Sequence, residues 1–445
     1  MFDCIVIGTG PAGYTAAVRA KQLGGEVCII ERDLTGGVCT NWGCIPTKAM
    51  ITAAKAVESA KAAKELGILA KIKINFKGIS KHRDRVIKAS RDSLEENLSS
   101  YGINIIRGEG KVISGTQVSV GKRIIEGKNI VIATGSVPTI PGFIKLSKTV
   151  ISSKELVTIK KIPESLIIIG GGVIGLEFAT LFSSLGTKIT IIEMFDRILF
   201  NADPEVSEEL SKEYKKKGIK ILTRHKVISA SGNIVEVESL DTQKKRKLES
   251  ELILVAIGRH ALVDAPALDK AGIKYDKTGI IVNERMQTSL PSVYAVGDST
   301  GKSMLAHAGI EQATVAAENI MGKDRKMDYT VPACIYTMPE VAMVGEIESS
   351  GALVGRFPFS SNARARCESS TEGFVKAVIK DGFLVGVHII GHNATEMISE
   401  GALAVKNRMK AKDIIETIHA HPTYAEALKC AIEDAYHLSV DQKKK

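Results

Sequence analysis

Several features that would define a protein class are scarce in this sequence. Aromatic residues account for 5% of the 445 residues, with one tryptophan, and only 7 residues are cysteine. An odd, small number of cysteines in so long a chain argues against a secreted disulfide framework and favours a reducing compartment, so we expect a cytoplasmic protein. The opening residues MFDCIVIG contain neither a basic region nor a small-residue cleavage site, so a secretory signal is not expected.

Long uncharged stretches are equally scarce. The longest, from Ser165 to Thr187, contains one charged residue, Glu177, and would be long enough to span a bilayer. Three adjacent glycines and the carboxylate in its middle predict a buried strand, a turn and a helix instead. We therefore expect no association with a membrane.

The charge balance is basic, with a net charge of +10, which raises the question of nucleic-acid binding. The basic residues are spread along the chain, and aromatic residues are not interleaved with them. This distribution is typical of solvated faces, so we expect no nucleic-acid partner. A protein that mainly binds anionic partners through a clustered basic face stays the competing class.

Two segments of the chain share one plan. Residues 3–31 and 166–193 each read as a strand, a glycine-rich turn, a helix and a second strand that ends in glutamate. Glu31 follows Gly13 by 18 residues, and Glu193 follows Gly175 by 18 residues. The chain is also too long for one hydrophobic core, so two to four domains are expected.

The first of these segments predicts a dinucleotide site. Gly8, Gly10 and Gly13 fit the G-x-G-x-x-G pattern, in which the glycines turn the chain, admit a pyrophosphate and allow the helix to pack on the strand. The amino terminus of that helix faces the phosphates. Glu31, at the end of the next strand, can accept hydrogen bonds from a ribose diol.

The second segment predicts another such site, from Gly170, Gly172, Gly175 and Glu193. A carboxylate beside the adenosine ribose repels a 2′-phosphate, so NAD is favoured over NADP, although the nearby Arg197 leaves NADP open. Two dinucleotide sites on one chain imply that one holds a flavin and the other a nicotinamide, between which a hydride can pass.

A pair of cysteines follows the first site in the segment GGVCTNWGCIPTK. Cys39 and Cys44 are separated by four residues and lead into a helix predicted to begin near Pro46, whose dipole would stabilise a thiolate. The spacing differs from a zinc C-x-x-C, and no second cysteine pair completes a tetrahedral site, so no metal is expected. A redox-active disulfide beside the flavin is one reading, and two buried free thiols are the other.

Short aliphatic strands ending in glycine mark further parts of the ligand-binding edge. They occur at 129–135, 252–258 and 293–298, and we expect them to deliver backbone to a ligand at their carboxyl ends. A charged helical region is predicted between about Lys48 and Leu98. After Val331, strands at FVKAVI and GFLVGVHII precede helices near 394–406 and 411–418, which predicts an α+β domain.

These motifs together resemble one family. The series GTGPAGYTAAVRAKQLG, GGVCTNWGCIPTKA, VIATGS, IIIGGGVIGLEFA, AVGD, LAHAG and HAHPTYAEAL runs in order over nearly the whole chain. It is similar to the pyridine nucleotide-disulfide oxidoreductases, which include lipoamide-, glutathione- and mercury-dependent members. The resemblance implies bound FAD and NAD, a redox-active disulfide and a homodimer.

The resemblance also implies roles for individual residues. Cys39 would exchange with the substrate, and Cys44 would lie against the flavin and pass electrons to it. Lys48 would lie near flavin N5, paired with Glu177. The remaining implied cofactor-binding positions are Thr134, Gly135, Asp298 and Ala306 on the flavin side and Gly258 on the NAD side.

A histidine near the carboxyl terminus completes the implied site. His421 and Glu426, in HPTYAE, match the family's acid/base pair, which one subunit supplies across the dimer interface to the other. Dithiol oxidation needs a base with a pKa near neutrality, and a histidine held by a carboxylate suits that task. A lone histidine before a proline turn would otherwise be read as a surface residue. His419 is expected to be structural or exposed.

The sequence departs from the family pattern in three places. Trp42 stands where a smaller apolar residue is usual, so access to the disulfide could be altered. The segment GRHALVD lacks the usual asparagine after the arginine, and Tyr424 with Ala425 replaces a more common pair.

The predicted fold is α/β, with two Rossmann-like dinucleotide-binding domains, one inserted in the other, and an α+β dimerisation domain. The predicted ranges are 1–145 and 266–330 for FAD, 146–265 for NAD and 331–445 for the interface. The expected activity is oxidation of a dihydrolipoamide group on the lipoyl domain of a 2-oxoacid dehydrogenase or glycine-cleavage complex, with reduction of NAD⁺. A disulfide reductase with another small substrate is the alternative.

Overall fold

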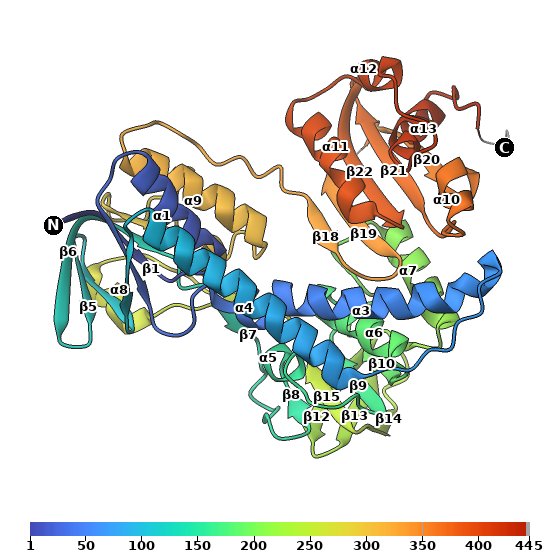
Figure 1. Ribbon diagram of the computed structural model, residues 1–445, viewed down its shortest axis with the longest axis horizontal. Helices are drawn as coiled ribbons and strands as arrows, with labels where there is room; N and C mark the ends of the chain where they lie inside the picture. Colours follow the sequence, from blue (N-terminus) through green and yellow to red (C-terminus); the bar gives the residue numbers. More distant parts are fainter. Residues whose placement is uncertain (349, 442–445) are drawn as a thin grey trace.

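The computed structural model describes residues 1–348 and 350–441 and divides into three units that surround two long helices (Figure 1). The last residues of the predicted interface domain, 442–445, lie outside the described residues. Mixed α/β architecture is present in the first two units, and an antiparallel sheet with helices forms the third, as the fold class predicted. The domain boundaries themselves stay a prediction.

The first unit holds a sheet in the order β3-β2-β1-β6-β5-β4, with β17 also paired to β6. Its elements are β1 (Phe2–Ile7), α1 (Pro11–Gln22), β2 (Val27–Glu31), β3 (Asn104–Arg107), β4 (Gly110–Ser114), β5 (Gln117–Val120), β6 (Arg123–Ile132), α8 (Ala265–Ala271), β17 (Val293–Ala295), η2 (Gly297–Thr300) and α9 (Ala306–Ile320). β17 runs parallel to β6, with Val293 beside Ile130. The chain therefore returns to this sheet after it has built the second unit.

The second unit holds a parallel sheet in the order β11-β10-β9-β15-β8, covered by an antiparallel meander. Its elements are β8 (Val150–Ile151), α5 (Ser153–Leu156), β9 (Ser165–Ile169), α6 (Val173–Ser184), β10 (Lys188–Ile192), α7 (Pro204–Lys216), β11 (Lys220–Leu222), β12 (His225–Ser231), β13 (Ile234–Ser239), β14 (Lys245–Glu249) and β15 (Leu252–Val255). Strands buried on both faces must be apolar throughout, which explains the runs LIII and ITII.

The helical region between the cysteines and β3 is not continuous. It consists of α2 (Gly37–Trp42), α3 (Cys44–Ala62), the short turn η1 (Ala63–Leu66) and α4 (Phe76–Ser100). The prediction of a helical region from Lys48 to Leu98 is wrong at 67–75, because Gly67 takes a φ of +80° and ends η1, the turn that follows α3. α4 restarts at Asn75, whose side chain accepts a hydrogen bond from the Gly78 N–H at 3.1 Å.

α3 ties the cysteines to the second unit. Met50, Ile51 and Ala54 on α3 are buried in one apolar cluster with Phe178 and Phe182 of α6. The helix that begins at Cys44, α3, is thus anchored on α6, the helix that follows the second glycine loop. A two-stranded ribbon, β7 (Ser136–Pro138) with β16 (Arg259–Ala261), carries the chain between the units.

The third unit is an antiparallel sheet in the order β18-β19-β22-β21-β20, with α11 packed on β19 and β22 and α13 on β20 and β21. Its elements are β18 (Ala333–Ile335), β19 (Glu340–Gly345), β20 (Leu353–Pro358), η3 (Phe359–Ser361), α10 (Ala363–Cys367), β21 (Phe374–Lys380), β22 (Phe383–Gly391), α11 (Ala394–Lys406), α12 (Ala411–Glu416) and α13 (Glu426–Ala435). The strands and helices predicted after Val331 are present.

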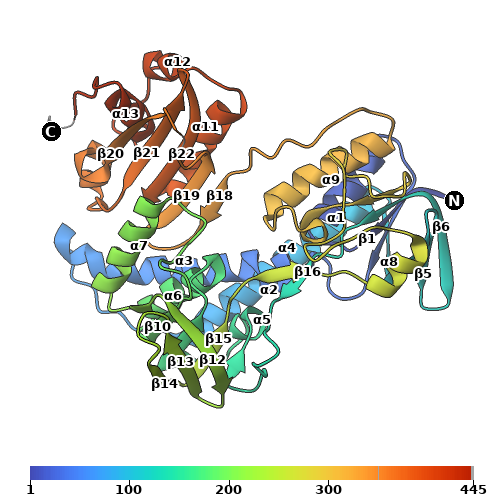
Figure 2. The ribbon, with the colours of Figure 1, turned by 180° about the vertical axis from the view of Figure 1, so that it is seen from behind.

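A buried ionic cluster joins the second and third units where α7 meets β20 and β21 (Figure 2). The Lys376 ammonium lies 2.7 Å from carboxylate oxygens of Asp203 and Glu205, and the side chains of Lys376 and Asp203 are 2% and 0% exposed. Arg356 pairs with Glu205 at 2.6 Å. These ion pairs hold the amino terminus of α7 against the third unit.

Candidate active site

The first glycine loop leaves space at the amino terminus of α1. Gly8 has a φ of +104°, and a Cβ on Gly13 would come 1.9 Å from the Gly8 carbonyl oxygen, so neither position accepts a side chain. A Cβ on Gly10 would meet nothing within 4 Å. Close packing at Gly8 and Gly13 with open space at Gly10 is the arrangement that a pyrophosphate requires.

Glu31 is held firmly at the end of β2. One carboxylate oxygen accepts hydrogen bonds from the Thr9 backbone N–H at 2.9 Å and the Thr9 hydroxyl, and the other accepts from the Asp33 N–H at 2.8 Å. Thr9 was not predicted as a site residue, although its place inside the glycine pattern was a usable signal. The contacts orient the carboxylate beside the glycine loop, where it can receive a ribose diol.

The second glycine loop repeats this geometry on β9 and α6. Gly170 has a φ of +107°, a Cβ on Gly175 would lie 2.5 Å from the Gly170 carbonyl oxygen, and a Cβ on Gly172 would meet nothing within 4 Å. Glu193 accepts hydrogen bonds from the backbone N–H groups of Gly171 at 2.6 Å and Phe195 at 2.9 Å. The two loops thus share one local structure, as their equal spacing predicted.

Cys39 and Cys44 lie on either side of the break between α2 and α3, and both are free thiols in the structure. Interaction between the Cys39 and Cys44 thiols raises the pKa of Cys39 and lowers the pKa of Cys44 to about 7. Lys48, one turn along α3, also lowers the pKa of Cys44 through its positive charge. The pair is therefore polarised, and Cys44 is the more acidic of the two thiols.

Lys48 connects the cysteines to the second unit. Its ammonium donates to both carboxylate oxygens of Glu177 on α6, each at 2.8 Å, and lies 4.5 Å from the centre of the Tyr336 ring. Glu177 is buried and also accepts the Tyr336 backbone N–H at 3.2 Å. Tyr336 was missed by the sequence reasoning, because nothing local relates it to the cysteines.

Asp298 lies in η2 rather than at the end of a strand. The strand predicted at 293–298 ends at Ala295, since Gly297 turns the chain with a φ of +69°. Asp298 accepts a hydrogen bond from the Ser136 hydroxyl at 2.5 Å, and Arg259 donates to the same hydroxyl at 2.8 Å. Ser136 was also missed, although it is the last residue of the motif VIATGS.

The remaining predicted positions lie on the connecting ribbon and on α9. The Thr134 hydroxyl donates to the Leu262 carbonyl at 2.8 Å, and Gly135 and Gly258 have φ values of +77° and +127°. Ala306 is the first residue of α9, where no side chain caps the helix amino terminus. Backbone N–H groups at such a terminus are free to bind an anionic or polar ligand group.

The predicted acid/base pair is formed within the third unit. His421 Nδ1 lies 2.8 Å from a carboxylate oxygen of Glu426, whose other oxygen accepts the Thr423 N–H at 2.8 Å. The His421 side chain is 69% exposed, so its second ring nitrogen faces solvent. His419 is structural instead, with its side chain 7% exposed and hydrogen-bonded to Glu400 at 2.8 Å.

The structure does not bring His421 to the cysteines of the same chain. His421 precedes α13 in the third unit, whereas α2 lies beside the first and second units (Figure 2). Trp42, at the end of α2, packs against the apolar cluster of the second unit and has the Lys154 ammonium 4.1 Å from its ring centre. Within one protomer the thiols and the imidazole therefore form separate half-sites.

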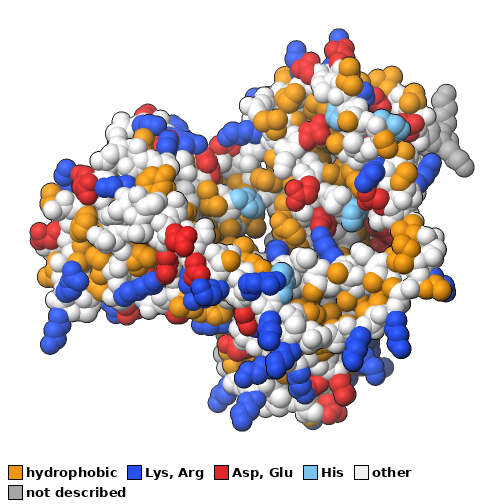
Figure 3. All heavy atoms as spheres, in the orientation of Figure 1, with side chains coloured by type: hydrophobic (Ala, Val, Ile, Leu, Met, Phe, Trp, Pro, Cys, Tyr) orange, Lys and Arg blue, Asp and Glu red, His pale blue; other side chains and the backbone are white. Residues whose placement is uncertain are grey.

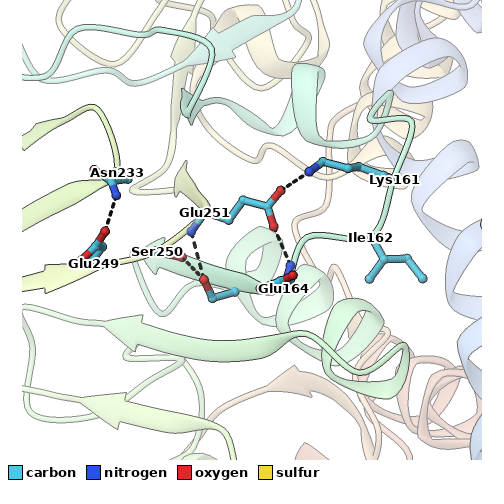
Figure 4. Close-up of a pocket in the computed structure, with 8 residues that line it drawn as sticks. Lys161, Ile162, Glu164, Asn233, Glu249, Ser250 and Glu251 are labelled. Carbon is cyan, nitrogen blue, oxygen red and sulfur yellow. Dashed lines mark hydrogen bonds and ion pairs between the residues drawn. The ribbon is translucent and has the colours of Figure 1, made fainter.

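A hollow of about 740 Å³ in the second unit lies away from these residues, beside the ion pair of Lys161 with Glu251 (Figure 4). Its polar side chains form hydrogen bonds and ion pairs with one another, as Asn233 does with Glu249. The hollow therefore contains no pair of side chains comparable to the two thiols or to His421 with Glu426. Among the described residues no group of three or more acidic, cysteine or histidine side chains could hold a metal ion. No helix in the described ranges is long and apolar enough to cross a membrane.

Two family models match the chain. One, described as pyridine nucleotide-disulphide oxidoreductase, covers residues 2–316, and the dimerisation domain of the same family covers residues 331–432. The chain belongs to this family of oxidoreductases. Membership confirms the predicted family, and the dimerisation domain supports a homodimer.

Characterised relatives in the oxidoreductase family are similar over nearly the full length. Dihydrolipoyl dehydrogenase of Chlamydia pneumoniae is 39% identical over 96% of this chain and 95% of its own. The enzyme of that name from Geobacillus stearothermophilus is 36% identical over 97% and 96%. Among solved structures, LpdA from Mycobacterium tuberculosis has a TM-score of 0.88 at 26% identity, covering 98% of this chain and 99% of its own. The flavoprotein disulfide reductase RclA from Escherichia coli has a TM-score of 0.86 at 25% identity, over 97% and 99%.

Proposed function

We propose that the protein is an NAD-linked dihydrolipoamide dehydrogenase. The observation that carries this proposal is the cysteine pair, in which Cys44 is the more acidic thiol and feels the charge of Lys48, between two dinucleotide loops. Relatives at 35–39% identity over nearly the whole chain bear the name dihydrolipoyl dehydrogenase. The net reaction is oxidation of a dithiol to a cyclic disulfide with reduction of NAD⁺ to NADH.

The first glycine loop and Glu31 are proposed to hold FAD. The open space at Gly10 suits the pyrophosphate, and the oriented carboxylate of Glu31 suits the adenosine ribose. Further positions proposed to contact FAD are Lys48, Thr134, Gly135, Asp298 and Ala306. When bound, FAD supplies an acceptor for two electrons that can be passed on as a hydride.

The second glycine loop is proposed to hold NAD. Gly172 offers the same open space, and Gly258, with its φ of +127°, lies in the loop that follows β15 at the carboxyl edge of the sheet. Glu177 would hold Lys48 at the junction of the two sites, since its bidentate contact crosses from α6 to α3. Glu193 would accept hydrogen bonds from the adenosine ribose.

The dithiol step follows from the two half-sites. A substrate thiolate attacks the Cys39 sulfur of the oxidised pair, which breaks the Cys39–Cys44 bond and leaves Cys44 as a thiolate. The second substrate thiolate attacks the mixed disulfide, so the substrate leaves as a cyclic disulfide and Cys39 is released. His421 of the partner subunit removes the thiol proton from the substrate, and Glu426 keeps that imidazole oriented. The two electrons then reside on the cysteine pair.

We further propose a homodimer whose substrate is carried by the lipoyl domain of a 2-oxoacid dehydrogenase or of a glycine-cleavage complex. The exposed His421–Glu426 pair fits a site completed between subunits. The odd, small number of cysteines fits a reducing compartment, the cytoplasm. Lys and Arg side chains are interspersed with Asp and Glu over the face in Figure 3, so a basic binding surface receives no support there.

Turnover measurements test the proposal. The purified holoenzyme should oxidise dihydrolipoamide with NAD⁺ far faster than it turns over glutathione disulfide, coenzyme A disulfide or Hg(II). Replacement of Cys44 by serine should abolish lipoamide turnover while the flavin stays bound. Turnover of only a non-lipoyl substrate would leave the chain a disulfide reductase of another specificity.

A further inference from the structure

We propose that Asp196 and Phe200 hold Arg197 away from the nucleotide, so that the adenosine end of the second site accepts only a ribose with a free 2′-hydroxyl. This inference rests on the proposed NAD site at Glu193. It concerns Arg197, which lies four positions after the proposed ribose-binding carboxylate of Glu193. In the sequence, this arginine was the reason that NADP stayed an alternative to NAD.

The guanidinium of Arg197 makes three contacts with its neighbours in the chain, and its Nε is buried without a hydrogen-bond partner. One terminal nitrogen donates to the Phe200 carbonyl at 3.0 Å, the other lies 3.3 Å from an Asp196 carboxylate oxygen, and the guanidinium carbon is 4.8 Å from the centre of the Phe200 ring. A cation over an aromatic face and beside a carboxylate is stabilised twice. The charge of Arg197 is therefore already compensated within its own loop.

The loop that carries these contacts is anchored at both ends. Leu199 donates its N–H to the Gly171 carbonyl at 2.9 Å, and Arg224 donates its N–H to the Phe195 carbonyl at 2.9 Å. The rings of Phe195 and Phe200 stack at 4.3 Å with 18° between their planes. The two rings thus close the loop between its anchors and keep the Phe200 face under the guanidinium.

A second arginine at this edge is engaged as well. The Arg224 side chain pairs with Asp241 at 2.5 Å, so its charge is also compensated by a neighbouring carboxylate. Glu193, by contrast, is fixed by the backbone N–H groups of Gly171 and Phe195 and keeps its negative charge facing the glycine loop. A 2′-phosphate would meet this carboxylate while the terminal nitrogens of Arg197 are engaged by Asp196 and Phe200, so the repulsion would not be offset.

The test uses adenosine 2′,5′-bisphosphate and AMP as probes, with binding to the holoenzyme measured by calorimetry. The double variant Asp196→Asn/Phe200→Leu removes the carboxylate and the aromatic face that hold Arg197. We expect it to bind the bisphosphate about fivefold to tenfold tighter than the unmodified protein, because a freed guanidinium forms charge-assisted hydrogen bonds with phosphate. AMP affinity should change by less than about twofold.

A third substitution, Arg197→Met, provides the matched control. Added to the double variant, it should cancel the gain for the bisphosphate, and made alone it should leave bisphosphate affinity within about twofold of the unmodified protein. An unchanged bisphosphate affinity in the double variant, or a gain that survives Arg197→Met, overturns the inference. A large loss of bisphosphate affinity in the single Arg197→Met variant also overturns it, because Arg197 would then already serve the phosphate. If the unmodified protein binds neither probe, the NAD site fails and the inference falls with it.

Discussion

A hydrogen bond from the Cys39 thiol to the Cys44 sulfur would account for the lowered pKa of Cys44, and this assignment makes a quantitative prediction about thiol reactivity. Replacement of Cys39 by alanine removes the donor, whereas replacement by serine keeps a hydroxyl that can donate in its place. Because the bond stabilises the charged form of Cys44, its loss should raise the pKa of Cys44, and the serine variant should keep a lower pKa than the alanine variant.

The size of the difference follows from the energy of such bonds. A hydrogen bond to a charged group contributes about 1.5–3 kcal/mol, and about 1.4 kcal/mol corresponds to one pKa unit. The pKa of Cys44 should therefore lie about 1–2 units higher in Cys39→Ala than in Cys39→Ser. The attraction of Lys48 and the opposing effect of burial are common to both variants and cancel in the comparison.

The assay is alkylation of the reduced holoenzyme by iodoacetamide from pH 5 to 10, with the modified cysteine identified by mass spectrometry. At pH values below both midpoints, Cys44 should react about tenfold or more slowly in the alanine variant, since only the thiolate is nucleophilic. Cys367, exposed in the third unit, serves as the internal reference. Coincident pH profiles for the alanine and serine variants would refute the assigned hydrogen bond.

Three further predictions concern the ion cluster, the acid/base pair and the second glycine loop. Lys376→Met leaves the buried Asp203 carboxylate without its cation, while Glu205 keeps Arg356, and should lower the free energy of unfolding by about 3–5 kcal/mol, measured in denaturant; an unchanged midpoint would contradict the role assigned to the cluster. Glu426→Gln keeps a side chain of the same length beside His421 but removes the negative charge of Glu426, so kcat should fall about tenfold or more; an unchanged kcat would separate Glu426 from the base. Gly172→Ala should keep a normal melting temperature but lose NADH affinity in calorimetry, because its added Cβ enters the open space proposed for the nucleotide. Gly175→Ala should lower the melting temperature, because its Cβ meets the Gly170 carbonyl oxygen. The reverse pattern would refute the assignment of the open space to the nucleotide.

Local features of the sequence were sufficient to predict the two dinucleotide loops. Each loop needs a glycine with positive φ, a second glycine where the helix packs on the strand, and a glutamate at the end of the next strand. Steric rules that act over short distances determine these requirements, so the spacing of the residues predicted the structure of both loops. The apolar parallel strands of the first two units and the helices of the third unit were predictable for the same reason, since periodicity and caps are local signals. The break at Gly67 was missed because a positive φ in a charged, helix-forming region leaves only a single residue as its signal.

Only the tertiary structure decided which distant side chains meet. The Ser136 hydroxyl accepts a hydrogen bond from Arg259 and donates one to Asp298, and the Lys48 ammonium lies over the ring of Tyr336, through contacts that no spacing along the chain specifies. Arg197 could have served a 2′-phosphate as far as its position in the sequence shows, and the direction of its guanidinium follows from the fold of one loop. The physical reason is that a side chain's charge acts on whatever the packed backbone brings within a few ångströms, and that neighbourhood is a property of the whole fold.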